Sequence, residues 1–397
     1  MSDKPLHICL ITGDFPALTE TFVTTKALEL AARGHAVTVI KNMDVGSFNQ
    51  SHLAQVQKAG IKILSFRIPN SLTGLLKSSF AHPAVFISAF SFSTNKFKTA
   101  FKNKLQHSLL KKQHFDIIHY EFSGLAVNYL QTIKSAKCPV VVSCRGTAEK
   151  VKPVSEPLRK DKLKQLFSAV NSIHCVSADM ADTIIHYGAD KAKIFINRPS
   201  IDPAIFKRST PYSNANAKIE FLTIGRFTFQ KGYLLGLLGM KKLKENGVVF
   251  TWKIIGDGPQ KEEIMYHIHA LDLKDCVELV GKKNRDEILE VFQKTDVFVL
   301  PSVYEGIANV CLEAMSMELP VIATKSGGME EVIVHTQNGL LCDVYNPYQL
   351  ATLLKIVSED FTFRKNLGIN ARKTILEKFT LERQVNVFEE QYYKLQN

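Results

Sequence analysis

The chain alternates short apolar runs with stretches in which apolar residues recur every three or four positions. In the first half the apolar runs span residues 7–12, 36–41, 116–120, 139–143 and 172–176. In the second half they span residues 219–225, 250–255, 276–280, 296–300 and 320–324. Continuous apolar runs of this length are typical of strands that are buried on both faces of a parallel sheet. Their alternation with helices predicts an α/β fold whose parallel sheets are covered by helices.

Two such series in a chain of 397 residues predict two Rossmann-like domains. The stretch 197–216 is rich in Pro, Ser, Asn and Thr, and the domain boundary should lie there. We therefore expect domains at residues 1–200 and 201–378, which bind ligands beyond the carboxyl ends of their strands. Residues 379–397 should form one amphipathic helix, because their apolar positions follow steps of four and three residues. These positions are Leu381, Val385, Phe388, Tyr392 and Leu395.

The second half carries charged residues at the predicted carboxyl ends of its strands. Glu305 follows one strand, and Glu313 lies eight residues later in the next helix. The segment 306–310 opens that helix, where unpaired backbone N–H groups and the helix dipole favour an anion. Arg226 and Lys231 follow another strand and so fall at the same edge of the sheet. Backbone amides and cations can bind a phosphate, and two carboxylates can bind hydroxyl groups. This combination suits a nucleotide sugar.

These residues lie in motifs that resemble those of the retaining glycosyltransferases of family 4. Glu305 and Glu313 resemble the E-x7-E motif of that family. Three further matches are G-R-x-x-x-x-K-G at 225–232, G-x-G-P at 256–259 and G-G-x-x-E at 327–331. All four occur in the family's order, densely in the second half and sparsely in the first. The resemblance implies the GT-B fold, in which two Rossmann-like domains face each other across a cleft and a C-terminal helix crosses back to the N-terminal domain. Packing of that helix on its own domain is the alternative.

The resemblance also implies a role for individual residues. Arg226 and Lys231 would stabilise the departing diphosphate. Glu305 would bind hydroxyl groups of the transferred sugar, and Glu313 those of the ribose. His119, at the end of a predicted strand, occupies a position where the family often has an active-site histidine, although a structural role is the alternative. The other implied donor-binding positions are Gly225, Gly256, Gly258, Gly306, Ile307, Ala308, Asn309 and Val310. Glu318 stands where the family commonly has a glycine, which concerns a helix end rather than the donor.

The first loop, residues 12–22, resembles the F-P-x-x-[ST]-E-T-F loop of a subgroup that builds bacterial exopolysaccharide and surface polysaccharide. It has fewer glycines than the loop of many relatives, so its backbone approaches a ligand less closely. We therefore expect acceptor contacts from Thr19, Glu20 and Thr21. A purely structural role is the alternative, with Thr19 as the cap of the next helix and Glu20 in its first turn. Arg145, which follows another strand, is a further acceptor-binding candidate.

The sequence shows no metal-ligand pattern. It contains no D-x-D motif, and His267 and His269 lie two residues apart on a predicted helix, hence on different faces. A guanidinium, an ammonium and a helix N-terminus can stabilise the charge for which some enzymes use a divalent metal. We therefore expect no metal and no other cofactor. The seven cysteines form no C-x-x-C pair, which favours reduced core residues in the cytosol.

The formal net charge of +12 comes from the first half. Residues 1–200 hold 26 basic and 13 acidic residues, and the remainder hold 24 and 25. Within the first half, residues 70–115 carry seven lysines, interleaved phenylalanines and no acidic residue. Apolar residues that step by four between these lysines, from Phe97 to Leu109, predict a basic amphipathic helix suited to an anionic membrane surface. A core-packed helix with a solvated basic face is the alternative. We expect no nucleic-acid partner, because no recognised binding motif is present.

No apolar run reaches the roughly 18 residues that span a bilayer, and the N-terminus lacks a signal-peptide pattern. We expect a cytoplasmic protein that is peripheral on the inner face of the cytoplasmic membrane. The expected function is retaining, metal-independent transfer of a sugar from a nucleoside-diphosphate donor, with UDP favoured over GDP. The expected acceptor is a glycan or a lipid-linked intermediate of bacterial surface polysaccharide. The alternatives are a sugar-nucleotide 2-epimerase of the same fold and an inactive sugar-nucleotide-binding relative.

Overall fold

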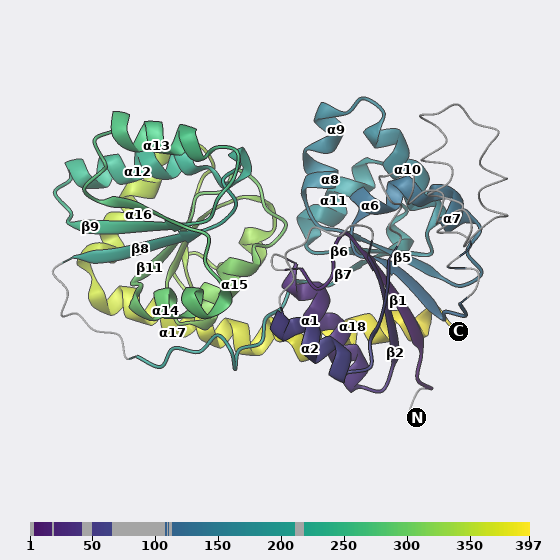
Figure 1. Ribbon diagram of the computed structural model, residues 1–397. Helices are drawn as coiled ribbons and strands as arrows, with labels where there is room; N and C mark the ends of the chain where they lie inside the picture. Colours follow the sequence, from purple (N-terminus) through teal and green to yellow (C-terminus); the bar gives the residue numbers. More distant parts are fainter. Residues whose placement is uncertain are drawn as a thin grey trace, which may run out of the picture. The chain divides into compact units, whose positions relative to one another are not determined.

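The computed structural model describes residues 4–17, 20–41, 50–65, 108, 110, 113–210 and 218–397. The chain divides into two compact units, which Figure 1 shows. The first unit contains Met1–Cys175, Ala181–Asn197 and Val385–Asn397. The second contains Val176–Met180 and Arg198–Gln384.

The first unit is built on a parallel sheet with the strand order β3-β2-β1-β4-β5-β6-β7. Its strands are β1 (His7–Thr12), β2 (Ala36–Lys41), β3 (Lys62–Ser65), β4 (Ile117–Tyr120), β5 (Val140–Cys144), β6 (Ser172–Cys175) and β7 (Ile194–Ile196). The five strands predicted from the sequence are present within one residue of their expected bounds. The two edge strands, β3 and β7, were not predicted.

Short helices follow these strands, as Figure 1 shows. They are α1 (Thr21–Ala32), α2 (Gln50–Lys58), α6 (Ser123–Ala126), α7 (Leu130–Lys134), α8 (Thr147–Lys150), α9 (Lys152–Ser155), α10 (Arg159–Ala169) and α11 (Ala178–His186). Two 3-10 turns, η1 (Val127–Tyr129) and η2 (Lys191–Lys193), complete the set in the described part of the chain. The first helix ends at Ala32, and Gly34 adopts a left-handed φ of 94° just beyond it, as glycines that terminate helices commonly do.

The second unit has a parallel sheet with the order β10-β9-β8-β11-β12-β13. Its strands are β8 (Ile219–Ile224), β9 (Phe250–Ile255), β10 (Val277–Gly281), β11 (Val297–Leu300), β12 (Val321–Thr324) and β13 (Leu340–Cys342). Its helices are α12 (Tyr233–Glu245), α13 (Lys261–Ala270), α14 (Arg285–Lys294), α15 (Asn309–Ser316), α16 (Pro347–Glu359) and α17 (Phe361–Lys378), with 3-10 turns η3 (Phe229–Lys231) and η4 (Gly327–Glu331). The edge strand β13 was not predicted.

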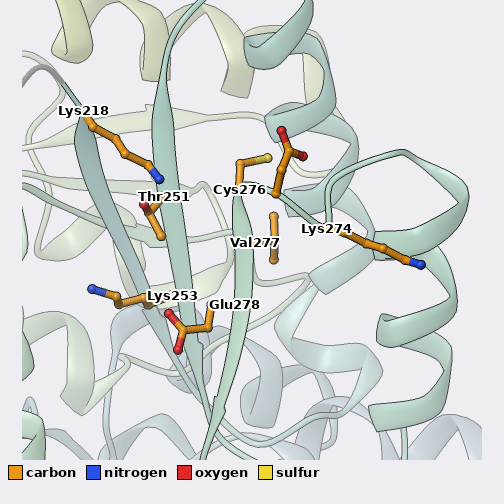
Figure 2. Close-up of a pocket in the computed structure, with 8 residues that line it drawn as sticks. Lys218, Thr251, Lys253, Lys274, Cys276, Val277 and Glu278 are labelled. Atoms are coloured by element: carbon orange, nitrogen blue, oxygen red, sulfur yellow. The ribbon is translucent and has the colours of Figure 1, made fainter.

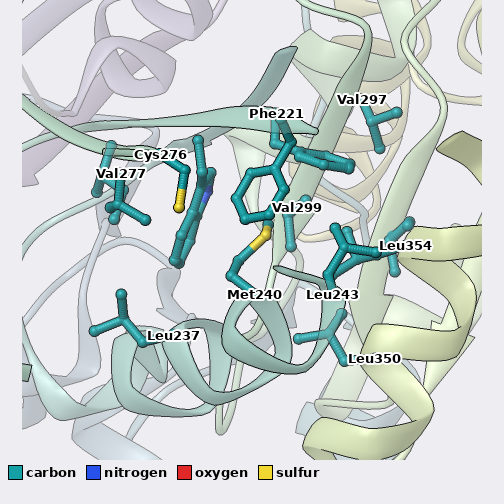
Figure 3. Close-up of a cluster of buried hydrophobic side chains, with 14 of the residues drawn as sticks. Phe221, Leu237, Met240, Leu243, Cys276, Val277, Val297, Val299, Leu350 and Leu354 are labelled. Carbon is teal, nitrogen blue, oxygen red and sulfur yellow. The ribbon is translucent and has the colours of Figure 1, made fainter. Parts of the chain in front are cut away.

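Successive residues of the central strands in this unit enter two separate hydrophobic layers. Val297 and Val299 of β11 belong to one layer, and Phe298 belongs to the other. Figure 3 shows the first layer, in which Leu237 of α12 and Leu350 of α16 pack toward the sheet. The apolar run of β11 is therefore continuous because helices cover both faces of the sheet.

The C-terminal helix α18 (Leu381–Lys394) carries the predicted apolar stripe. Val385, Phe388 and Tyr392 are at most 1% exposed. Residues Val385–Asn397 belong to the first unit, where the Glu389 carboxylate accepts hydrogen bonds from Arg33 and His35. In the described ranges, no helix is both long enough and apolar enough to cross a membrane.

Candidate active site

Lys231 and Glu305 form the centre of a polar cluster in the second unit. The Lys231 ammonium lies 2.6 Å from Glu305 Oε1, and the two side chains are 15% and 7% exposed. Ser302 donates a hydrogen bond to the same oxygen over 2.7 Å, and the Gln230 amide donates to the other oxygen over 3.3 Å. Both residues follow strands, Lys231 after β8 and Glu305 after β11. Because β8 and β11 are parallel neighbours, their carboxyl ends bring the two residues together, as the sequence predicts.

Glycines hold the loops of this cluster against one another. A Cβ atom at Gly256 would overlap the Gly225 carbonyl oxygen, and one at Gly232 would overlap the Pro301 carbonyl oxygen. Gly327 and Gly328 approach the Glu305–Gly306 backbone equally closely. The glycine motifs are therefore required for contact between loops. This close packing fixes the position of the Glu305 loop from two sides.

Helix α15 begins at Asn309, three residues later than the sequence predicts, with Ala308 at its N-cap. Gly306, Ile307 and Ala308 form the buried loop that leads into it. The first backbone N–H groups of the helix, including those of Asn309 and Val310, have no carbonyl partner within the helix and point beyond its end. This helix start and Lys231 lie in the loops that follow the neighbouring strands β11 and β8, at the carboxyl edge of the sheet. Such an arrangement is suited to a phosphate group.

Two further donor-site candidates differ in burial. Arg226 lies one residue after Gly225 and its side chain is exposed. Among the described residues it has no ion-pair partner. Glu313 lies on α15 and is partly buried, and burial raises its pKa to about 7 although the positive charge of Arg285 acts in the opposite direction. A carboxyl group held in this way would become a stronger hydrogen-bond acceptor once it ionises.

A separate hollow lies at the opposite edge of the same sheet. Figure 2 shows Lys218, Lys253 and Lys274 around this hollow of about 350 Å³, at the amino ends of β8, β9 and β10. Lys253 pairs with Glu220 over 3.0 Å, so part of its positive charge is balanced. None of the residues that line this hollow belongs to the Lys231–Glu305 cluster. Its position does not match the carboxyl edge where ligands of this fold class bind.

The first unit contains a buried ionic triad at the carboxyl edge of its own sheet. Lys26 of α1 forms an ion pair with one oxygen of Glu121, which directly follows β4. Arg145, which follows β5, donates to the other oxygen over 2.7 Å and to the Glu121 carbonyl over 3.0 Å. Lys26 and Glu121 are at most 2% exposed, whereas the Arg145 side chain is 16% exposed. Burial alone would raise the pKa of Glu121, but the two cations lower it.

Aromatic rings and a second carboxyl group surround the exposed side of this triad. The Arg145 guanidinium lies 4.2 Å from the centre of the Phe22 ring. Glu20 accepts a hydrogen bond from Thr12 over 3.3 Å, and burial raises its pKa despite the nearby charge of Arg145. Glu20 occupies the N-cap position of α1, but its side chain makes no capping hydrogen bond. The expected placement of Glu20 in the first helical turn is therefore corrected by one residue.

His119 belongs to a chain of hydrogen bonds inside the first unit. The Asn197 carbonyl can only accept, so His174 Nε2 carries the proton of their 2.7 Å bond. His174 Nδ1 then accepts from Ser143, whose oxygen accepts from His119 Nε2, and Tyr392 donates to His119 Nδ1 over 2.6 Å. His119 is fully buried, and burial lowers its pKa well below the usual range. Both ring nitrogens form hydrogen bonds within the protein, which agrees with the alternative that His119 has a structural role. Its contact with a transferred sugar stays a prediction.

Several expectations fall on other parts of the chain. Thr19 and nearly all of the basic segment 70–115 lie outside the described residues. Thr21 is the first residue of α1 and is partly buried. All seven cysteines are free, and all except Cys138 are buried. No cluster of three or more metal-ligating side chains occurs in the described ranges.

Sequence reasoning missed four residues that shape the two clusters. Ser302 and Gln230 hold Glu305, Glu121 holds Arg145, and Lys26 pairs with Glu121. Glu121 carries a usable signal, because a carboxylate directly after a buried strand falls at the ligand-binding edge of a parallel sheet. Lys26 carries none, since it appears in the sequence as one polar position of a helix.

Family comparisons agree with this arrangement of two units. Residues 19–205 match the family described as Glycosyltransferase Family 4, and residues 207–374 match Glycosyl transferases group 1. The chain belongs to these glycosyltransferase families. The chain therefore has one matched domain over most of each unit.

Curated relatives are distant but numerous. The amylovoran biosynthesis glycosyltransferase AmsK of Erwinia amylovora is 28% identical over 249 residues, which are 61% of each chain. The colanic acid biosynthesis glycosyltransferase WcaL of Salmonella typhimurium is 23% identical over 387 residues, or 92% of this chain and 94% of that one. The match thus spans about three-fifths of AmsK and nearly all of WcaL.

Solved structures show the same fold. Sucrose-phosphate synthase from Thermosynechococcus elongatus has a TM-score of 0.79 and 17% identity, with 98% of this chain and 99% of that chain covered. Anabaena HepE in complex with UDP-glucose has a TM-score of 0.73 and 16% identity, with coverages of 98% and 100%. The glycosyltransferase therefore has the GT-B class of fold that the sequence resemblance implies.

Proposed function

We propose that this glycosyltransferase transfers a sugar from a nucleoside-diphosphate donor to a glycan or lipid-linked acceptor of surface polysaccharide. UDP is the favoured carrier. The names of AmsK and WcaL place those proteins in amylovoran and colanic acid biosynthesis, which supports the acceptor class. The structures of HepE contain UDP or UDP-glucose, which supports the donor class. The donor, the acceptor and the transfer reaction are all part of this proposal.

The observation that carries the proposal is the Lys231–Glu305 cluster next to the start of α15. Lys231, the exposed Arg226 and the first amides of α15 would bind the diphosphate. In the transfer, the bond between C1 of the sugar and the diphosphate oxygen breaks as the acceptor oxygen bonds to C1. The diphosphate leaves with the electron pair, and its growing negative charge is stabilised by these cations and amides. This set of charges supports a reaction that does not require a divalent metal.

Glu305 and Glu313 would orient the donor through its hydroxyl groups. Hydrogen bonds to a charged carboxylate contribute roughly 1.5–3 kcal/mol each. A donor phosphate oxygen would take the acceptor's proton on the face from which the diphosphate departs, which retains the configuration at C1. Glu20 and Arg145 of the first unit, together with Thr19 and Thr21, would bind the acceptor. The buried Glu121 would hold Arg145 for this task.

The first experiment is a thermal-shift screen of UDP-, GDP- and ADP-sugars. Ligand that binds only the folded protein raises its stability, so the cognate donor should raise the melting temperature. The shift should be largest for a UDP-sugar and should disappear in the Arg226→Ala/Lys231→Ala double variant. A shift that persists in this variant would place the diphosphate elsewhere. A larger shift with a GDP-sugar would overturn the preference for UDP.

A product analysis then tests the reaction class. Incubation with an α-linked UDP-sugar and a glycan acceptor should release UDP and form an α-linked product, with or without a chelator. A β-linked product would overturn retention, and loss of activity with the chelator would overturn metal independence. Conversion of the donor to its 2-epimer without acceptor would identify an epimerase. Donor binding without any product would identify an inactive sugar-nucleotide-binding protein.

A further inference from the structure

An exposed aromatic side chain lies beside the Lys231–Glu305 cluster. Phe229, in the turn η3, is 56% exposed, whereas every other phenylalanine whose side chain the structure describes is buried or partly buried. Phe227, two residues earlier, is 1% exposed and packs against Tyr233 with ring centres 5.2 Å apart. The core of the second unit therefore includes Phe227 and leaves Phe229 uncovered. A large apolar ring next to a binding site gains free energy when a ligand covers it.

Tyr304 lies against the Phe229 ring from the neighbouring loop. The two ring centres are 5.9 Å apart, with an angle of 49° between the ring planes. Hydrogen bonds join the loops, because the Val303 N–H donates to the Gln230 carbonyl over 2.7 Å and the Gln230 amide donates to the Tyr304 carbonyl over 3.2 Å. The Gly232 N–H donates to the Phe229 carbonyl over 3.1 Å and closes the turn. The two rings thus form one fixed surface, which we call the aromatic platform.

The aromatic platform adjoins the residues that the proposed function assigns to the sugar end of the donor. Phe229 lies two residues before Lys231, and Tyr304 directly precedes Glu305. In a nucleotide sugar, the diphosphate lies between the ribose and the transferred sugar. With the ribose at Glu313 and the diphosphate at Lys231, the transferred sugar lies on the side of Glu305. The aromatic platform is therefore placed for the sugar ring rather than for the base.

We propose that the aromatic platform binds the C–H face of the transferred hexose. A pyranose ring carries hydroxyl groups around its rim and C–H groups on its faces. The face of an aromatic ring is negative and attracts such C–H groups, and the burial of both apolar surfaces adds to the attraction. Glu305 would bind the hydroxyl rim of the same sugar, so adjacent residues bind its rim and its face. This contact rests on the proposed function and adds a second kind of interaction with the donor sugar.

The experiment is calorimetric titration of the full chain with UDP, UDP-glucose and UDP-galactose. Both hexoses keep at least one ring face free of axial hydroxyl groups. UDP contains every part of the donor except the sugar, so the ratio of the Kd of a UDP-sugar to the Kd of UDP measures the sugar's contribution. In Phe229→Ala, the Kd of the UDP-sugar should rise about fivefold or more, while the Kd of UDP should stay within about twofold. Phe229→Tyr keeps a ring and should keep the wild-type ratio.

A matched control tests whether the effect is local. Tyr266→Ala removes an aromatic ring of the second unit that is 68% exposed on α13, and it should leave every Kd unchanged. Phe229 is exposed, so Phe229→Ala should fold like the wild type. Urea unfolding can be read by the fluorescence of the single tryptophan, Trp252, which is fully buried in the second unit. Equal unfolding midpoints would show that a lower sugar affinity comes from the lost contact.

Saturation-transfer NMR locates the contact on the ligand. Saturation of the protein's aromatic protons should reach the C–H protons of the bound hexose in the wild type and should reach them less in Phe229→Ala. The uracil and ribose signals of the same ligand serve as an internal reference and should not change between the two proteins.

Three results would overturn the proposal. The first is a wild-type Kd ratio in Phe229→Ala, even if transfer slows, since the ring would then serve the acceptor. The second is an equal loss of affinity for UDP and the UDP-sugars, since the ring would then stack on the base. The third is binding of UDP without binding of either UDP-sugar. If UDP itself does not bind, the proposed function fails, whereas an unchanged ratio with bound UDP overturns only the contact with the sugar face.

Discussion

Lys231 Nζ lies 2.6 Å from Glu305 Oε1 and thereby joins two sequence motifs that are 74 residues apart. The contact is largely buried, and Ser302 and Gln230 add hydrogen bonds to the same carboxylate. A diphosphate that approaches Lys231 must share this ammonium with Glu305. The pair is therefore both a structural contact and the proposed link between the diphosphate and the transferred sugar.

This dual role predicts different outcomes for two neighbouring cations. Lys231→Met leaves Glu305 buried without its cation, which should destabilise the second unit by about 3 kcal/mol. Arg226→Met removes an exposed charge and should change stability by less than about 0.5 kcal/mol. Both should slow transfer about 10²–10³-fold if they stabilise the leaving group. Urea unfolding followed by Trp252 fluorescence measures the first effect in the correct unit. Equal stability of the two variants would contradict a structural role of the ion pair.

The central strands could be predicted because each is an apolar run long enough to reveal burial on both faces. Val297–Leu300 shows this directly, since alternate residues enter the two hydrophobic layers. The edge strands β3 and β7 contain no buried residue, and β13 contains only three residues. Such segments bury little apolar area of their own, so their pairing depends on the neighbouring strand rather than on their own pattern.

The positions of the main site residues could be predicted about as well as the central strands. Lys231 and Glu305 follow strands that turned out to be neighbours, so the carboxyl-edge rule placed them correctly. Which partner neutralises which charge could not be predicted, because Lys26 on a helix and Glu121 after a strand lie 95 positions apart and nothing in the sequence pairs them. The side-chain direction of Arg145 likewise depends on packing against Phe22.

Glu313 predicts a pH dependence of donor binding. Its pKa is raised to about 7, so the carboxyl group is mostly neutral at pH 6 and mostly ionised at pH 8. If ribose hydroxyls donate to the ionised form, affinity for a UDP-sugar should rise with pH through 7, by about tenfold between pH 6 and 8. The stability contribution has the opposite sign, because a carboxyl group with a raised pKa favours the folded state at low pH and loses this contribution as pH rises toward 7.

Calorimetric titration with UDP-glucose measures this dependence without interference, since its diphosphate has no ionisation near neutral pH. Glu313→Gln is the matched control, because its amide has the same shape and no titration. Its affinity should be weaker at pH 8 and independent of pH between 6 and 8. A wild-type affinity that does not change over this range would remove Glu313 from the donor site.

The buried triad of the first unit predicts strong coupling between Lys26 and Glu121. Glu121→Gln leaves two cations without their shared counter-charge and should destabilise the first unit by about 3–5 kcal/mol. Lys26→Met/Glu121→Gln should cost less than the sum of the two single changes, since removal of both buried charges avoids an unpaired one. Hydrogen exchange read by peptide mass spectrometry can assign the loss to β1, β4 and β5. Additive costs would show that the ion pair contributes no coupling.

Glu318 predicts a stabilising substitution outside the site. It is a non-glycine residue with φ of 60°, at the end of α15 where the family commonly has glycine. A left-handed conformation costs a residue with a side chain roughly 1–2 kcal/mol, which glycine avoids. Glu318→Gly should therefore be about 1 kcal/mol more stable than Glu318→Ala. Both variants lose the 3.7 Å contact with Arg372 equally, so the comparison isolates the backbone term. Urea unfolding read by Trp252 fluorescence measures the difference, and equal midpoints would show that this turn tolerates a side chain without strain.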